Sequence, residues 1–123
     1  MTARHRVGLT RDILDARGEP AFGTAALDML DRAPGLVWEY LPEVVPEITA
    51  DHAAHYDAIY VNLPRVPAAA VGRADCRLRV VARHGVGYDS VDVAAMTRAG
   101  VIVTHTPSSM PRPVATIALR ARV

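Results

Sequence analysis

The sequence has little of several features that would assign a protein to a particular class. It has one cysteine, Cys76, which excludes an internal disulfide and a cage of thiolate ligands for a metal ion. No apolar run approaches the roughly 20 residues that cross a bilayer, so we expect no membrane-spanning segment and a cytoplasmic location. Neither sign of charge is in excess, because 14 basic and 13 acidic side chains leave a net charge of +1. We therefore expect neither a membrane nor a nucleic acid as a partner.

The chain does have enough apolar residues for one domain. Of its 123 residues, 50% are hydrophobic and 22% are charged, which is typical of a globular protein. Aromatic residues make up only 5%, so we expect a core of small and β-branched side chains. A domain of this length buries enough surface to be stable without disulfides or metals.

Strand-like and helix-like patterns alternate along the chain. Short apolar runs predict five strands, at 7–9, 36–41, 57–63, 78–83 and 101–103. Helical spacing predicts helices over 22–30 and 49–56, with one helical turn over 68–71. The run at 57–63 barely alternates, which indicates a strand buried on both faces. Strands joined by helices predict a parallel sheet with helices on both faces.

The clearest of these units joins the fourth predicted strand to the fifth. Ser90 is the expected N-cap of its helix, and Asp92 in the first turn favours the positive end of the helix dipole. Gly100 is suited to the left-handed position that ends a helix. An apolar stripe between them recurs at every fourth residue, through Val91, Ala95 and Ala99.

The loop inside this unit is a candidate binding site. It reads Arg83-His84-Gly85-Val86-Gly87-Tyr88-Asp89, and it follows a strand at the sheet edge where ligands bind in open parallel sheets. Two glycines flanking one residue let the backbone bring N–H groups close to a ligand. Successive N–H groups form a concave site for an anion such as a carboxylate, and Arg83 adds positive charge. A plain tight turn is the other interpretation of an isolated Gly-x-Gly.

Two further segments accompany this loop, namely Arg98-Ala99-Gly100-Val101 and Thr106-Pro107. With them, the string from Arg83 to Asp92 resembles the D-isomer-specific 2-hydroxyacid dehydrogenase family, which includes phosphoglycerate, glycerate, glyoxylate and D-lactate enzymes. The resemblance covers residues 78–119 in detail. It implies an α/β, flavodoxin-like domain over 6–106, with a five-stranded, mainly parallel sheet and helices on both faces.

The resemblance also implies a substrate and a cofactor. The substrate would be a small 2-oxo or 2-hydroxy acid, and the cofactor NAD or NADP. The backbone N–H groups of the loop would hold the substrate carboxylate, with two side chains beside them; these substrate-binding residues are Arg83, His84, Gly85, Val86 and Gly87. Val86 would also lie near the nicotinamide. Met110 stands at a cofactor-side position where the family often has asparagine, and it cannot donate an amide's hydrogen bonds.

The parts of the family that carry the chemistry are missing from the sequence. No Gly-x-Gly-x-x-Gly follows a strand, so there is no cradle for a pyrophosphate. The family's catalytic arginine, glutamate and histidine come after its nucleotide-binding fold, so we expect no catalytic residue in this chain and no turnover by the chain alone. Residues 107–123 would begin the helix between domains, and its apolar side offers a route to a homo-oligomer.

Two alternatives involve other chemistry. His52 and His55 beside Asp51 lack a third ligand at a suitable spacing, so we expect a solvated helix face and no metal. A freestanding flavodoxin-like binding or interaction module without catalysis is the other candidate. A phosphoreceiver would need an acidic pair after the first strand and a lysine after the fifth, and the chain has Thr10-Arg11-Asp12 and Thr104-His105-Thr106 there.

Overall fold

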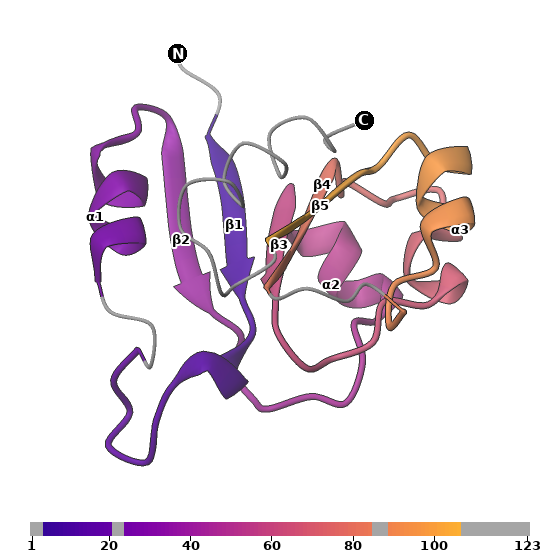
Figure 1. The fold of residues 1–123 in the computed structure, drawn as a ribbon. Coiled ribbons are helices and arrows are strands. Elements are labelled where there is room, and N and C mark those ends of the chain that lie inside the picture. Colours follow the sequence, from indigo (N-terminus) through magenta and orange to yellow (C-terminus); the bar gives the residue numbers. More distant parts are fainter. Residues whose placement is uncertain (1–3, 21–23, 85–88, 107–123) are drawn as a thin grey trace.

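Five parallel strands form the centre of the molecule (Figure 1). A computed structural model describes residues 4–20, 24–84 and 89–106. The strands are His5–Leu9 (β1), Leu36–Tyr40 (β2), Ala58–Val61 (β3), Val80–His84 (β4) and Ile102–Thr106 (β5). All neighbouring strands are parallel, and their order is β2-β1-β3-β4-β5. This is the flavodoxin-like order, so the predicted fold class is confirmed.

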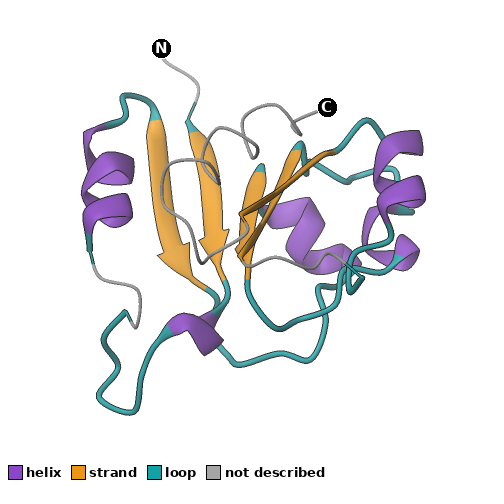
Figure 2. Ribbon diagram, in the orientation of Figure 1, coloured by secondary structure: helices purple, strands orange, loops and turns teal. Residues whose placement is uncertain are grey.

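Helices cover both faces of the sheet, as predicted (Figure 2). The α-helices are Ala25–Arg32 (α1), Ala50–His55 (α2) and Val93–Arg98 (α3). Two short 3₁₀ turns accompany them, η1 at Arg11–Ile13 and η2 at Ala68–Val71. Helix α1 lies on one side of the sheet, and α2 and α3 lie on the other. None of the helices in the described part of the chain has the length and apolar character needed to span a bilayer.

The side that carries α2 and α3 holds the larger core. Strands contribute every second residue to it, as in Ile59 of β3 and Val81 of β4, which are each 1% exposed. Helix α3 adds Met96, which is completely buried. The other members of this core come mainly from α2, η2 and the loops between them, and include Leu41, Ile48, Ala53, Tyr56, Val66, Ala70 and Leu78.

The side that carries α1 has a smaller core and an open groove. Its buried residues are Val7 and Leu9 of β1 and Ile13 of η1, and Leu27 and Leu30 of α1 pack against them. The remaining strands present half-buried side chains on this side, because α1 contacts mainly β2. An apolar groove of about 450 Å³ therefore remains, lined in part by Leu9, Leu30, Tyr60 and Ala82.

The ends of several elements differ from the sequence-based expectation. The predicted N-cap of α3, Ser90, is wrong, because the Asp92 carboxylate accepts the hydrogen bond from the Ala95 N–H at 3.0 Å. Gly100 does follow α3 with φ of 78°, as expected. Strand β3 is fully buried on one face only, because the α1 side leaves its alternate residues half-buried.

Candidate functional site

The carboxyl ends of the strands meet at one edge of the sheet, where the candidate loop begins. Arg83 and His84 are the last two residues of β4, and Asp89 and Ser90 are the first residues described after the loop. The predicted carboxylate-binding residues Gly85, Val86 and Gly87 lie outside the described residues, as does Met110. The described part of the site is therefore the base of the loop.

Arg83 and His84 approach this base from opposite faces of the sheet. Adjacent residues of a strand alternate between faces, and Arg83 is paired in register with Val61 and His105. Val61 belongs to the core under α2 and α3, so Arg83 lies on that side and His84 lies on the α1 side. His84 and His105 both lie at the carboxyl edge of the sheet. The same register places His105 on the face of Arg83, so the two histidines lie on opposite faces.

On the α2 and α3 side, Arg83 links the two ends of the loop. Its Nε donates to the Ser90 Oγ at 3.3 Å, across seven positions of the chain. Ser90 and Asp92 are in turn fixed to Val66. The Val66 N–H donates to the Ser90 carbonyl at 2.8 Å, and the Asp92 N–H donates to the Val66 carbonyl at 2.9 Å. Both ends of the segment 85–88 are therefore anchored on this side.

On the α1 side, the Tyr60 hydroxyl contacts Nδ1 of His84. The two rings come from neighbouring strands, with centroids 5.8 Å apart and planes inclined at 57°. Burial lowers the pKa of His84, the nearby Arg83 lowers it further, and Asp12 opposes both. Burial raises the pKa of Tyr60. The pair is therefore a neutral imidazole against a protonated phenol at neutral pH.

The ends of β1 and β3 are joined by two polar side chains at the same edge. Thr10 is completely buried, and its Oγ1 accepts from the Asn62 N–H at 3.2 Å. The Asp12 carboxylate accepts from the Leu63 N–H at 2.9 Å. The sequence analysis compared Thr10 and Asp12 with the residues of a phosphoreceiver and did not predict these bonds. A hydroxyl or carboxylate just after a strand often accepts a hydrogen bond from a nearby backbone N–H, and that pattern could have indicated them.

The remaining histidine candidates have local structural roles. His52 Nδ1 accepts from the Thr49 N–H at 2.9 Å, and Thr49 Oγ1 accepts from the His52 N–H, which forms a capping box at the start of α2. Burial lowers the pKa of His52. His55 Nε2 lies 3.4 Å from the Glu39 carboxylate. One ring nitrogen of each, His52 Nδ1 and His55 Nε2, is thus engaged within the domain.

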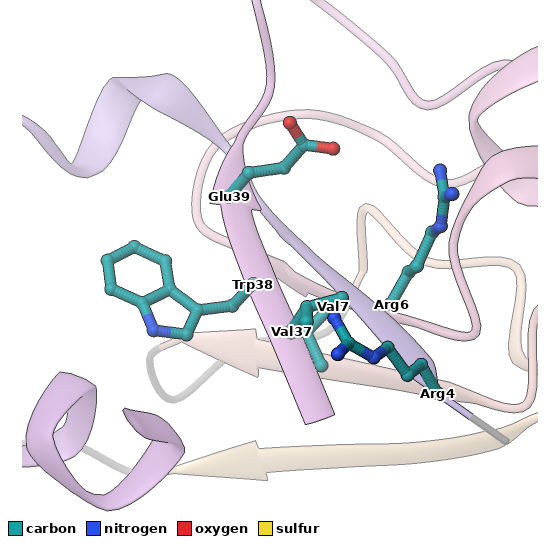
Figure 3. Close-up of a pocket in the computed structure, with 6 residues that line it drawn as sticks. All are labelled: Arg4, Arg6, Val7, Val37, Trp38 and Glu39. Atoms are coloured by element: carbon teal, nitrogen blue, oxygen red, sulfur yellow. The ribbon is translucent and has the colours of Figure 1, made fainter. Parts of the chain in front are cut away.

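A second hollow lies beside β1 and β2, away from the candidate loop (Figure 3). It has a volume of about 340 Å³ and is lined by Arg4, Arg6, Val7, Val37, Trp38 and Glu39. Two of its polar side chains meet His55 of α2, because Arg6 Nη1 lies 3.2 Å and Glu39 Oε1 lies 3.4 Å from His55 Nε2. This hollow does not contain the residues that the loop hypothesis needs.

Comparison with known proteins identifies the family that has this arrangement of strand, loop and helix. A family model described as D-isomer specific 2-hydroxyacid dehydrogenase, catalytic domain, matches residues 21–118. The chain belongs to this family. Family membership confirms the resemblance drawn from the residues after Leu78, and it makes the chain a domain of an oxidoreductase family.

The relatives are much longer than this member of the family. A glyoxylate reductase of Thermococcus onnurineus is 34% identical over 82 residues, which cover 67% of this chain and 25% of that protein. The chain therefore spans about a quarter of the length of this curated relative.

Two solved structures show the same fold. The 3-phosphoglycerate dehydrogenase of Entamoeba histolytica, solved with NAD⁺, superposes with a TM-score of 0.64 at 19% identity, covering 85% of this chain and 33% of that one. The D-lactate dehydrogenase of Aquifex aeolicus, complexed with NAD and lactic acid, has a TM-score of 0.58 at 20% identity, covering 93% and 32%.

Proposed function

We propose that this domain binds the acid substrate of an NAD- or NADP-dependent oxidoreductase that reduces a small 2-oxo acid to its D-2-hydroxy acid. The observation that carries the proposal is the anchored loop base at the carboxyl edge of β4. Arg83 with Ser90 holds it on one face, and His84 with Tyr60 holds it on the other. Membership of the 2-hydroxyacid dehydrogenase family supports the substrate class.

Within this proposal, the chain holds and orients the acid. The N–H groups of Gly85, Val86 and Gly87 would bind the carboxylate, because consecutive amides at a glycine-rich turn form a concave anion site. Arg83 and His84 stand at the start of that turn and would complete the site from the two faces. A nicotinamide, when bound, supplies the hydride for the 2-oxo carbon.

The chain's own residues do not fit the whole cofactor. The sequence has no glycine-rich dinucleotide fingerprint after a strand, so nothing in it cradles a pyrophosphate. Only Val86 and Met110 would border the nicotinamide. In the proposed arrangement, residues 107–123 lead from the domain at 6–106 to a nucleotide-binding fold. We therefore propose that the chain alone binds the cofactor weakly and has no turnover. Its self-association and its cytoplasmic location stay predictions.

Acid binding by the chain tests the proposal directly. We expect glyoxylate to shift the backbone amide resonances of Gly85, Val86 and Gly87 in a ¹⁵N-labelled sample, with saturation. Glycolamide, a neutral relative without a carboxylate, is the matched ligand control. Val86→Pro removes one N–H and should weaken glyoxylate binding at least tenfold, whereas Gly72→Ala, in an ordinary backbone conformation remote from the loop, should not.

Two results would count against this function. Equal shifts with glyoxylate and glycolamide would mean that no carboxylate site exists, which favours the freestanding interaction module. Oxidation of NADH by glyoxylate in the presence of the pure chain would contradict the expected lack of turnover.

A further inference from the structure

The hollow beside β1 and β2 has the charge and the donors of a binding site for an anion. We propose that it binds a doubly charged oxyanion, such as a phosphate group, between Arg4 and Arg6, and that protonation of His55 strengthens this binding. The hollow lies away from the candidate loop, so the inference does not depend on the proposed function.

The spacing of the two arginines brings them to the same face of the sheet. Arg4 stands two residues before Arg6, and residues at this spacing along an extended chain point to the same side. Both line the hollow of about 340 Å³, together with Glu39 of β2 (Figure 3). His55, the last residue of α2, contacts Arg6 and Glu39 from the helix that lies on this side. The hollow is thus bounded by two cations, one anion and one histidine.

Most of the hydrogen-bond donors of the two guanidinium groups are unused. Among the residues that the structure describes, the Arg4 side chain has no hydrogen-bond or ion-pair partner, and the Arg6 side chain has one hydrogen-bond partner, His55. A guanidinium carries five N–H donors in a planar fork that matches the oxygens of a phosphate. Two such forks can hold opposite sides of one tetrahedral dianion, whereas a carboxylate is satisfied by a single fork.

One nitrogen of His55 faces both a donor and an acceptor. Arg6 Nη1 lies 3.2 Å and Glu39 Oε1 lies 3.4 Å from His55 Nε2. An arginine can only donate and a carboxylate can only accept, whereas an imidazole nitrogen does one or the other. Without a proton, Nε2 accepts from Arg6, and with a proton it donates to Glu39. The two contacts are therefore alternatives that the protonation of His55 selects.

Protonation of His55 changes the hollow in three ways that favour an anion. It releases Arg6 from the imidazole, it pairs the Glu39 carboxylate that otherwise repels an anion, and it adds a positive charge. The other carboxylate beside Arg6, that of Asp57, is already paired, because it accepts from the Arg6 N–H at 2.8 Å and lies 3.3 Å from Arg77 Nη2. Since coupling between two binding events is reciprocal, an anion in the hollow also favours the protonated imidazole.

The other titratable groups around His55 stay uncharged near neutral pH. The Tyr56 ring packs edge-on against the imidazole, with centroids 4.7 Å apart. Burial, followed by the charge of Glu39, raises the pKa of Tyr56 to about 12. Burial lowers the pKa of His52 in the same helix, Asp51 opposes this, and the charge of His55 lowers the pKa of His52 again. His55 is therefore the group that couples pH to the charge of the hollow.

Sulfate is the probe for this site, because it stays a dianion between about pH 5.5 and about pH 7.5, whereas a phosphate group titrates in that range. In a ¹⁵N-labelled chain at constant ionic strength, we expect sulfate to shift the backbone amide resonances of Arg6 and Val37, with saturation. Binding should be roughly fivefold tighter at the lower pH, the effect of about one surface charge pair.

Competition with sulfate identifies the source of the anion. Inorganic phosphate and glycerol 3-phosphate should both displace sulfate from the hollow, and their relative affinities decide whether the site takes free phosphate or a phosphate ester. Failure of both to compete would overturn the assigned class of ligand.

Substitutions of the arginines test the site itself. Arg4→Gln and Arg6→Gln should each weaken sulfate binding at least about fivefold at the lower pH, because each removes one charge pair with the dianion. Arg98→Gln is the matched control, because Arg98 is an exposed arginine of α3, outside the hollow, and should leave the binding unchanged. Equal losses in all three variants would reveal a general effect of net charge and overturn the site.

Substitutions of the histidine test its role. His55→Gln keeps an acceptor for Arg6 but gains no charge, so it should bind sulfate weakly at both pH values. His55→Lys carries a charge throughout this range and cannot accept, so it should bind tightly at both. A wild-type affinity that is independent of pH, or a pH dependence that persists in His55→Gln, would overturn the role of His55.

The resonances that respond separate this inference from the proposed function. Sulfate shifts confined to residues 83–90 would place the anion at the candidate loop and overturn the site in the hollow. Glyoxylate binding is measured at Gly85, Val86 and Gly87, so its failure would end the proposed function and leave the sulfate experiment with its own answer.

Discussion

The two faces of the sheet are built from the same strands but are covered to very different degrees. Under α2 and α3, side chains such as Ile59 and Met96 are 1% and 0% exposed. Over the other face, Met29 of α1 is 70% exposed, and an apolar groove of about 450 Å³ runs along the strands. Alternate residues of one strand therefore have different roles. The residues that face α2 and α3 are buried and supply most of the stability, and the residues that face α1 remain accessible.

The candidate site divides along the same line. Arg83 belongs to the well-covered face and is committed to Ser90, whereas His84 belongs to the open face and meets Tyr60. The two residues are adjacent in sequence, but they lie on opposite faces of the sheet and have different partners. Substitutions on the two faces should therefore have unequal effects on stability.

The largest expected effect comes from the covered face. Met96→Ala should lower the free energy of unfolding by about 2–5 kcal/mol, because a completely buried side chain leaves a cavity. Met29→Ala is the matched substitution on the open face and should change it by less than about 0.5 kcal/mol. Urea unfolding followed by circular dichroism measures both. Equal losses for the two variants would contradict the expected difference in stability between the two faces.

The next effect is a loss of stability in alkali. Burial, followed by the charge of the nearby Glu39, raises the pKa of Tyr56 to about 12 from its usual value of 10.0. A raised pKa stabilises the folded state fully below the unfolded pKa, so this stability is present up to about pH 10 and declines as pH rises toward 12. The loss is at most about 2–3 kcal/mol.

Denaturant unfolding between about pH 9 and about pH 11.5 measures this decline. Tyr56→Phe should flatten it, because the titrating hydroxyl is gone. Tyr40→Phe, on the open face, should leave most of the slope in place. A slope that persists unchanged in Tyr56→Phe would assign the effect to other groups.

A third prediction concerns the close approach of β1 to Tyr56. A Cβ added at Gly8 would lie 2.9 Å from the Tyr56 ring, whose residue is 3% exposed and has little freedom to move. Gly8→Ala should therefore cost about 1–3 kcal/mol of stability, measured as a fall in the unfolding midpoint. Gly72→Ala, where the nearest atoms would be 3.8 Å away, should be close to neutral. A neutral Gly8→Ala would mean that the covered face is looser than the burial indicates.

The smallest predicted effect distinguishes two candidate caps of α3. Asp92→Ala should lower stability by about 1 kcal/mol, because the Ala95 N–H loses its acceptor. Ser90→Ala should have a smaller effect on stability, since its hydroxyl receives Arg83 rather than a helix N–H. Thermal unfolding of the two variants compares them. A larger loss of stability in Ser90→Ala than in Asp92→Ala would identify Ser90 as the N-cap of α3.

Sequence patterns were sufficient for most elements of the fold. Apolar runs located all five strands, and Gly100 marked the end of α3, because local propensity and spacing carry that information. The strand ends were less accurate. The fifth strand continues to Thr106, beyond the apolar run that predicts it, because its polar residues pair with β4 at the edge of the sheet. The cap of α3 was misplaced because Ser90 and Asp92 are both good capping residues.

The candidate site was predicted only in part. The loop and its flanking Arg83 and His84 followed from the motif, but Tyr60 was not among the candidates. Tyr60 is 24 positions from His84, and only the pairing of β3 with β4 makes them neighbours. The buried Thr10, which bonds across 52 positions to Asn62, was missed for the same reason.

The sequence by itself determined the alternation of strands and helices, the glycine-rich loop after β4 and the family to which the chain belongs. Only the tertiary structure decided that β3 lies between β1 and β4, that Arg83 and His84 face opposite sides, and that a tyrosine contacts the imidazole. The physical reason is that local patterns record the period of each element, whereas contacts between distant residues exist only once the strands have paired.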